Sequence, residues 1–133
     1  MDLTISGRAV ALWAGLHLLV LLVLSVLVVR QRRKHGVALG DGGAPELARA
    51  IRAFGNATEY IPAAMIALAT LALAGARPGI IHIVGTMMFC GRLLHGYGLW
   101  RTSEASAPRA AGMVLTWLAF LFSIVALLLH AVR

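Results

Sequence analysis

Residues 9–29 read AVALWAGLHLLVLLVLSVLVV, and residues 30–34, which read RQRRK, follow them directly. The first stretch contains no acidic or basic residue apart from one histidine. At about 1.5 Å of rise per residue it is long enough to cross a bilayer as a helix. It is too long for the apolar part of a cleavable signal peptide, and no small-residue cleavage motif follows it. This pattern predicts a retained membrane span that ends at a basic membrane surface.

Three more apolar stretches follow along the chain. With the first, they predict four spans at about residues 9–29, 57–75, 79–100 and 109–131, each of the length that a bilayer requires. We therefore expect one all-α integral membrane domain over residues 1–133, folded as a four-helix bundle.

The helix boundaries are indicated by proline and small polar residues. The second helix is expected to begin at Pro45 and to project beyond the bilayer before its apolar part begins. Pro62 lies inside this helix and should kink it, because proline removes a backbone hydrogen bond. Ser106 is placed to cap the fourth helix, whose first turn contains Pro108.

The composition excludes an ordinary soluble domain. Of the 133 residues 60% are hydrophobic and only 13% are charged, whereas soluble domains have roughly a quarter charged. The net charge of +7 does not indicate nucleic-acid binding, because the basic residues lie between apolar runs without interleaved aromatic residues. Membrane lipids, or an anionic ligand near the membrane, are the expected partners. The lone cysteine, Cys90, is expected to be a buried apolar residue.

The distribution of lysine and arginine predicts the orientation, since cytoplasmic segments are enriched in both. The side with the two termini carries Arg8, Arg77 and Arg133. The opposite side carries Arg30, Arg32, Arg33, Lys34, Arg49, Arg52, Arg101 and Arg109. We expect both termini to face away from the cytoplasm.

The second helix carries a stripe of polar side chains, Arg52, Asn56 and Glu59. Their offsets of four and three place them on one face within about 60°. A cation, an amide and a carboxylate together can bind a zwitterionic ligand, with arginine pairing a carboxylate and glutamate an amine. A structural alternative is that Glu59 neutralises Arg92 of the third helix as a buried ion pair. The two interpretations are compatible.

Two further positions can carry chemistry. His95 shares a helix face with Arg92 and can donate a hydrogen bond to a ligand, or it can be a packed histidine bonded to a backbone carbonyl. Arg109 lies at the expected start of the fourth helix, where an anion such as a thiolate is favoured, or it serves only membrane topology. No spacing of His, Cys, Asp or Glu resembles a metal site, so none is expected.

Residues 52–62, RAFGNATEYIP, resemble the second-helix signature R-x-x-x-N-x-x-E-x-x-P of the MAPEG family, the membrane-associated proteins in eicosanoid and glutathione metabolism. Residues 91–99, GRLLHGYGL, are similar to the third-helix motif of its bacterial members, and the basic run 30–34 also fits. The resemblance covers the whole chain in length and in the number and order of spans.

The resemblance implies a homotrimer in the bacterial inner membrane, with glutathione bound as co-substrate between subunits near the cytoplasmic face. Arg52, Asn56, Glu59 and His95 would hold glutathione, and Arg30 would reach it from the neighbouring subunit. Its functional partner would be a hydrophobic or lipid electrophile.

The resemblance also implies that Arg109 stabilises the glutathione thiolate, which makes the chain a glutathione transferase or peroxidase. Two positions depart from eicosanoid-forming relatives. Leu99 stands where those often have tyrosine, and Ala110 where some have serine. A general transferase is therefore the preferred interpretation. The alternatives are a non-catalytic binding or scaffold protein of the same fold, or a small transporter, although the ionisable stripe stays near one face.

Overall fold

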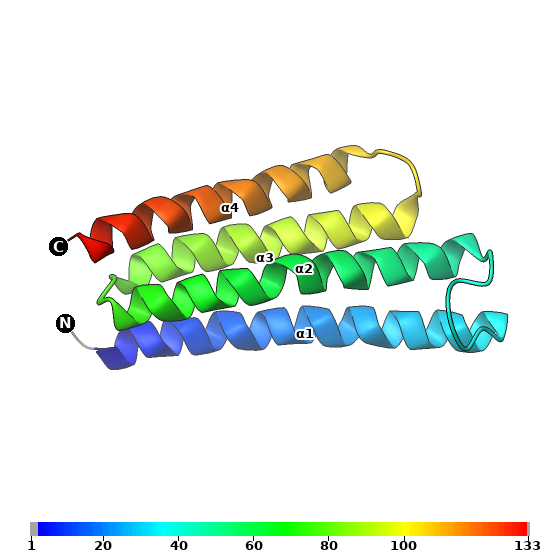
Figure 1. Cartoon of the computed structure of the whole chain (residues 1–133), viewed down its shortest axis with the longest axis horizontal. Helices are drawn as coiled ribbons and strands as arrows, with labels where there is room; N and C mark the ends of the chain where they lie inside the picture. The colour runs from blue at the N-terminus through cyan, green and yellow to red at the C-terminus, as the bar shows by residue number, and fades with distance from the viewer. Residues whose placement is uncertain (1–2, 133) are drawn as a thin grey trace.

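The computed structural model describes the backbone of residues 3–132 and shows four helices joined by loops. The helices are α1 (Leu3–His35), α2 (Pro45–Leu73), α3 (Pro78–Arg101) and α4 (Ala107–Ala131). Successive helices run in opposite directions, so the start of α1 and the end of α4 lie at the same end of the bundle (Figure 1). The described part of the chain contains no strand. The expected all-α four-helix membrane fold is confirmed.

Three of the described helices, α1 from Ile5, α2 and α4, are long and apolar enough to cross a membrane. α3, which contains His82, Arg92 and His95, is not among these three. α3 nevertheless lies beside α2 and α4, and it ends short of the loop between α1 and α2 (Figure 1). It connects the end of α2 with the start of α4 at the opposite end of the bundle. The positions of the four spans and their orientation remain predictions, and Arg133 lies outside the described residues.

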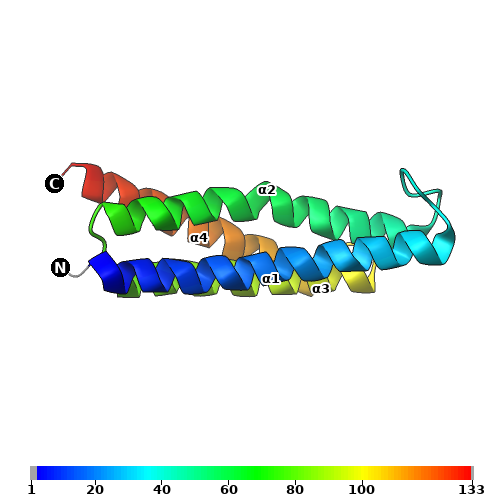
Figure 2. The same ribbon diagram turned by 90° about the horizontal axis from the view of Figure 1, so that it is seen from below.

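Proline lies in the first turn of three of the helices, where its fixed φ and missing N–H are favourable. α2 begins at Pro45 as expected, α3 at Pro78, and α4 has Pro108 in its first turn. Ser106 occupies the N-cap position of α4, but its hydroxyl makes no capping hydrogen bond, so the expected side-chain cap is not formed. Figure 2 shows α2 changing direction in its middle portion, where Pro62 lies inside the helix.

The core is built by small residues and aromatic rings that let the helices approach closely. Trp13 of α1 packs against Gly85 of α3, where any Cβ would clash with the indole ring. The Trp13 Nε1 donates a hydrogen bond to His82 Nδ1 over 3.2 Å. α3 packs most extensively against α4. Close approach at glycine is the usual way in which helices associate in lipid, because apolar burial itself supplies little driving force there.

The loop between α1 and α2 is held at the basic end of the bundle. Arg32 Nη1 donates to the carbonyl oxygens of Ala38 at 3.2 Å and Gly40 at 2.9 Å. His35 at the end of α1 lies 3.8 Å from Glu46 in the first turn of α2. The backbone N–H of Glu46, and after it the positive charges of neighbouring Lys34, His35 and Arg49, lower the pKa of the Glu46 carboxyl. Hydrogen bonds from Arg32 and the contact between His35 and Glu46 therefore hold this loop against the ends of α1 and α2.

Cys90 is exposed on the surface of α3, which corrects the expectation that it is buried. The buried face of α3 in this region is formed by Met88, Gly91 and Arg92. At about 100° per residue, Cys90 points away from all three. An apolar run in a membrane helix covers the lipid-facing side as well as the core, so apolar neighbours in the sequence do not imply burial.

Candidate functional site

Arg92 of α3 is the charged group at the centre of the bundle, with only 3% of its surface exposed. Its Nη1 donates to Asn56 Oδ1 of α2 over 2.7 Å. Its Nη2 donates to Thr116 Oγ1 of α4 over 2.7 Å and to the sulfur of Met113 over 3.5 Å. The guanidinium also lies over the ring of Tyr60, 5.1 Å from its centre. A buried charge requires partners, and both terminal nitrogens of Arg92 have them, so that Arg92 joins α3 to α2 and α4. Its Nε has no hydrogen-bond partner among the described residues.

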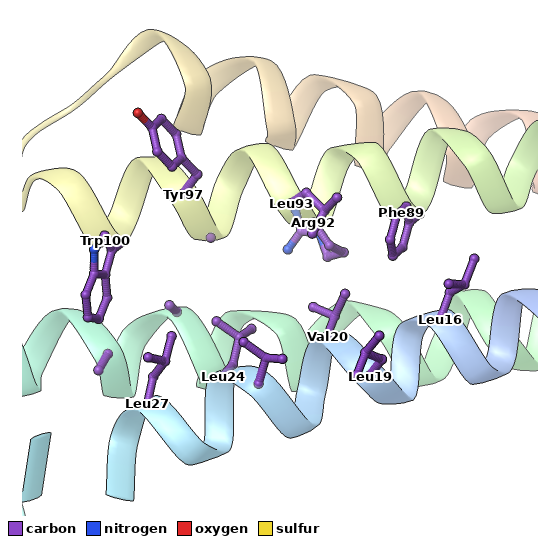
Figure 3. Close-up of a pocket in the computed structure, with 14 residues that line it drawn as sticks. Leu16, Leu19, Val20, Leu24, Leu27, Phe89, Arg92, Leu93, Tyr97 and Trp100 are labelled. Carbon is purple, nitrogen blue, oxygen red and sulfur yellow. The ribbon is translucent and has the colours of Figure 1, made fainter. Parts of the chain in front are cut away.

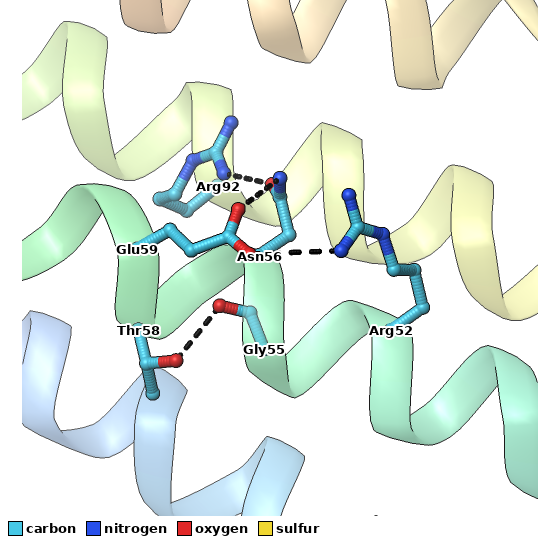
Figure 4. Close-up of polar contacts among 6 residues, drawn as sticks. All are labelled: Arg52, Gly55, Asn56, Thr58, Glu59 and Arg92. Atoms are coloured by element: carbon cyan, nitrogen blue, oxygen red, sulfur yellow. Dashed lines mark hydrogen bonds and ion pairs between the residues drawn. The ribbon is translucent and has the colours of Figure 1, made fainter.

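Asn56 connects Arg92 to the other residues of the polar stripe of α2 (Figure 4). Its Nδ2 donates to Glu59 Oε2 over 3.4 Å. The other carboxylate oxygen of Glu59 lies 3.6 Å from Arg52 Nη1. The side chains of Arg52 and Glu59 are 62% and 53% exposed, whereas Asn56 is buried. The three predicted residues of the stripe therefore lie together, with one edge in the core and one edge open.

The predicted direct ion pair between Glu59 and Arg92 is corrected by this arrangement. Among the described residues Glu59 lies within ion-pair distance of Arg52 and not of Arg92. The reason is helix geometry. Arg52 and Glu59 are seven residues apart and so point within about 20° of each other, while Asn56 is rotated from both toward the core by about 40° to 60°. Arg92 approaches from the core and meets Asn56 first.

His95 lies one turn after Arg92 on α3 and is 5% exposed. Gly112, three residues after Arg109, packs against the backbone of His95, and Arg92 bonds to Asn56 one turn after Arg52. Four of the residues singled out in the sequence, Arg52, Arg92, His95 and Arg109, therefore gather in one region of the bundle. The region carries an excess of positive charge, because Glu59 is the carboxylate that faces it in the described contacts.

Arg109 is positioned by the backbone contact between α3 and α4. A Cβ at Gly98 would lie 2.7 Å from the backbone nitrogen of Arg109, so only glycine permits this approach. A Cβ at Gly112 would lie 2.6 Å from the carbonyl oxygen of Gly91 and 2.8 Å from the Cβ of His95. These glycines bring the start of α4 to the histidine-bearing face of α3. The Arg109 side chain is partly buried at that point.

The sequence interpretation missed Thr116 and the glycines at the crossing of α3 and α4. Gly91 and Gly98 are seven residues apart on α3, and Gly112 and Thr116 are four apart on α4. Small residues repeated on one helix face are the signal that could have indicated this crossing.

Arg30, the other residue that the sequence predicts for the site, is exposed on α1. No hydrogen bond or ion pair between described side chains includes it. Its expected role toward a neighbouring subunit therefore stays a prediction. Within residues 3–132 no three His, Cys, Asp or Glu side chains gather where they could hold a metal ion.

Comparison with known proteins shows the family of the chain. The sequence model of the MAPEG family matches residues 10–129. The chain is 42% identical over 116 residues to the Inner membrane protein YecN of Escherichia coli strain K12, covering 87% of each protein. The protein of the same name from Escherichia coli O6:H1 matches equally well, at 42% over 116 residues and 87% of each chain. The chain is a membrane protein that belongs to the MAPEG family.

Proposed function

We propose that the chain is a membrane-bound glutathione transferase, with the capacity to act as a peroxidase toward lipid hydroperoxides. The observation that carries this proposal is the half-exposed stripe of Arg52, Asn56 and Glu59, which Arg92 links to the face of α3 that carries His95. The start of α4, with Arg109, packs against the same face of α3. Glutathione offers two carboxylates, one ammonium group and one thiol. A site with several guanidinium groups and one carboxylate matches those charges.

Each polar residue has a role that follows from its chemistry. Arg52 is free on its solvent side to pair with a glutathione carboxylate, since the Glu59 contact of 3.6 Å is long and exposed. Glu59 pairs with the ammonium group. Asn56 is held by Arg92 and orients Glu59. His95 donates a hydrogen bond, and Arg30 completes the site from a neighbouring subunit of a homotrimer.

Arg109 acts on the sulfur. It lies in the first turn of α4, where the N-terminal N–H groups and the guanidinium both favour a negative charge. Stabilising the thiolate lowers the free energy needed to release the thiol proton. The thiolate sulfur then forms a bond to the electrophilic carbon, and the leaving group departs with its electron pair. The bilayer delivers the hydrophobic electrophile to the same depth.

The proposed setting is a bacterial inner membrane with the site toward the cytoplasm. The site lies in the half of the bundle that leads to the basic loops after α1 and α3, and cytoplasmic loops are enriched in lysine and arginine. The inner-membrane name of the Escherichia coli relative is consistent with this setting. Both termini would then face away from the cytoplasm.

The test uses purified full-length protein in detergent micelles. Adding glutathione should produce the ultraviolet absorbance of a thiolate, and a chloronitrobenzene should be conjugated. Arg109→Ala should retain glutathione binding while turnover falls by about 10² to 10³, the effect of removing one oxyanion-type donor. Arg33→Ala, an exposed arginine at the same end of the bundle, is the matched control and should keep full turnover. A folded wild-type protein that shows neither thiolate absorbance nor conjugation would exclude the proposal.

A non-catalytic glutathione-binding protein is the second candidate, and Leu99 favours it. Leu99 is 3% exposed, so an alkyl group occupies a buried position where eicosanoid-forming relatives have a hydroxyl. Such a protein would bind glutathione without acidifying its thiol. Glutathione binding by the wild-type protein with neither thiolate absorbance nor conjugation would support this second function.

A further inference from the structure

A groove separate from the polar stripe runs between α1 and α3. Its walls are almost entirely apolar, and it has a cavity volume of about 390 Å³, or about 1010 Å³ when the open side is included. Figure 3 shows Leu16 and Phe89 at one end and Leu27 and Trp100 at the other. Arg92 lies between these ends, where it separates the groove from Asn56.

The length of the groove matches one leaflet of a bilayer. Leu16 to Leu27 on α1, and Phe89 to Trp100 on α3, each correspond to about 16 Å of helix. Half of the hydrocarbon thickness of a bilayer is about 15 Å. An occupant that enters from the basic end and stops at Phe89 would therefore reach approximately to the bilayer midplane.

The width of the groove limits the kind of occupant. Even with its open side included, 1010 Å³ spread along this length gives a mean cross-section of roughly 60 Å². An α-helix about 10 Å across needs about 80 Å². The groove therefore has room for an extended hydrocarbon chain but not enough to enclose a helix of a second protein.

The outer end of the groove carries a positive charge without an acidic partner. Arg101 follows Trp100 directly, and its Nη1 donates to the hydroxyl of Tyr97 over 3.0 Å. Its guanidinium also lies 5.7 Å from the centre of the Tyr97 ring. Neither of the ion pairs among described residues includes Arg101. Tyrosine and tryptophan at one end of an apolar groove are typical of the headgroup level of a membrane.

We propose that this groove binds one acyl chain of an anionic phospholipid, with the phosphate at Arg101 and the chain end near Phe89. Binding there does not depend on glutathione and is separate from the proposed transferase site. Charge complementarity selects an anionic over a zwitterionic headgroup, since one arginine at a membrane surface favours an anionic lipid by about fivefold.

Tryptophan quenching by brominated lipid tests the proposal directly. Trp100 lines the groove, and Trp13→Phe with Trp117→Phe leaves it as the only fluorescent tryptophan. The protein is reconstituted in phosphatidylcholine vesicles with brominated phosphatidylglycerol or brominated phosphatidylcholine. We expect phosphatidylglycerol to quench at about fivefold lower mole fraction. Native mass spectrometry of the chain with all its tryptophans, counting retained phosphatidylglycerol, provides a second measurement if the Trp13 variant does not fold.

Two pairs of matched variants locate the lipid. A Cβ at Gly96 would lie 3.9 Å from Leu24 Cδ2, so Gly96→Leu fills the groove without a backbone clash. Gly15→Leu makes the same change on an exposed position with nothing within 4 Å. We expect Gly96→Leu to lose the retained lipid and Gly15→Leu to keep it. Arg101→Gln should remove the preference for the anionic lipid, while Arg8→Gln at the opposite end should preserve it.

Four results would overturn the proposal. Equal quenching by the two lipids in the parent protein would exclude headgroup selection. Unchanged lipid retention by Gly96→Leu would place the lipid elsewhere. Loss of quenching as the protein-to-lipid ratio rises would show that a second copy of the chain covers the groove. Displacement of the lipid by a chloronitrobenzene but not by unlabelled phosphatidylglycerol would assign the groove to the electrophile instead.

Discussion

Arg92 of α3 donates a hydrogen bond to Asn56 of α2 over 2.7 Å in the interior of the bundle. The amide of Asn56 then donates to Glu59 over 3.4 Å. A buried cation and a half-exposed carboxylate are therefore coupled through a neutral side chain. This separates a structural role, which belongs to Arg92, from a ligand-facing role, which Glu59 and Arg52 are free to take.

Replacing Asn56 with leucine should destabilise the protein. Asn56→Leu leaves the Arg92 Nη1 without its acceptor in the core, and a lost hydrogen bond to a charged group costs about 1.5–3 kcal/mol. The measurement is unfolding in mixed micelles followed by circular dichroism. Thr58→Ala, which removes only a local bond to the Gly55 carbonyl on the exposed face, should change stability little.

The double variant tests whether the loss comes from this contact. Asn56→Leu combined with Arg92→Met replaces both partners by apolar groups, so the combined loss should be smaller than the sum of the two single losses by about 0.5–3 kcal/mol. Additive losses would show that the two residues act independently.

Adding one methyl group at Gly112 should push α4 away from α3. In Gly112→Ala the new Cβ would lie 2.6 Å from the Gly91 carbonyl oxygen and 2.8 Å from the His95 Cβ, and neither can turn aside. Overpacking of this kind costs about 1–3 kcal/mol. Because Arg109 begins the same helix, turnover should fall together with stability.

Gly79→Ala provides the control for Gly112, since its Cβ would meet nothing within 4 Å. Thermal unfolding and conjugation activity are measured on both variants. Wild-type stability in Gly112→Ala would contradict the close crossing of α3 and α4.

Neutralising Glu59 should weaken glutathione binding without harming the fold. Glu59→Gln removes the carboxylate that pairs with the ligand ammonium, and a charged hydrogen bond of this kind corresponds to about a tenfold rise in Kd. Its pair with Arg52 is exposed, so stability should change little. Isothermal titration calorimetry with glutathione measures the affinity. Glu46→Gln removes an acid of the same helix outside the site and should leave Kd unchanged.

Single-cysteine labelling should establish the four crossings. In a Cys90→Ser background, Asp41→Cys and Ser103→Cys lie in the loops after α1 and after α3, and Gly79→Cys lies at the opposite end. A membrane-impermeant maleimide added to sealed inverted vesicles should label the first two from one side and exclude the third. Labelling of Asp41→Cys and Ser103→Cys from different sides would show that either α2 or α3 does not cross.

Much of the fold was determined by the sequence alone, because bilayer thickness converts apolar length directly into helix length. Pro45 marked the start of α2 correctly, since proline is favoured in the first turn of a helix. The stripe of Arg52, Asn56 and Glu59 was equally readable, because offsets of three and four always share a helix face.

Only the tertiary structure decided which polar groups meet. The partner of Glu59 is Arg52 rather than Arg92, because the direction from which α3 approaches α2 is set by packing and has no periodic signal. The exposure of Cys90 likewise depends on which face of α3 meets the neighbouring helices. Local spacing determines the face on which a residue lies. The contacts at Gly98 and Gly112 determine which face of the neighbouring helix that residue meets. They do so because they set the distance and the register at which α3 and α4 pack.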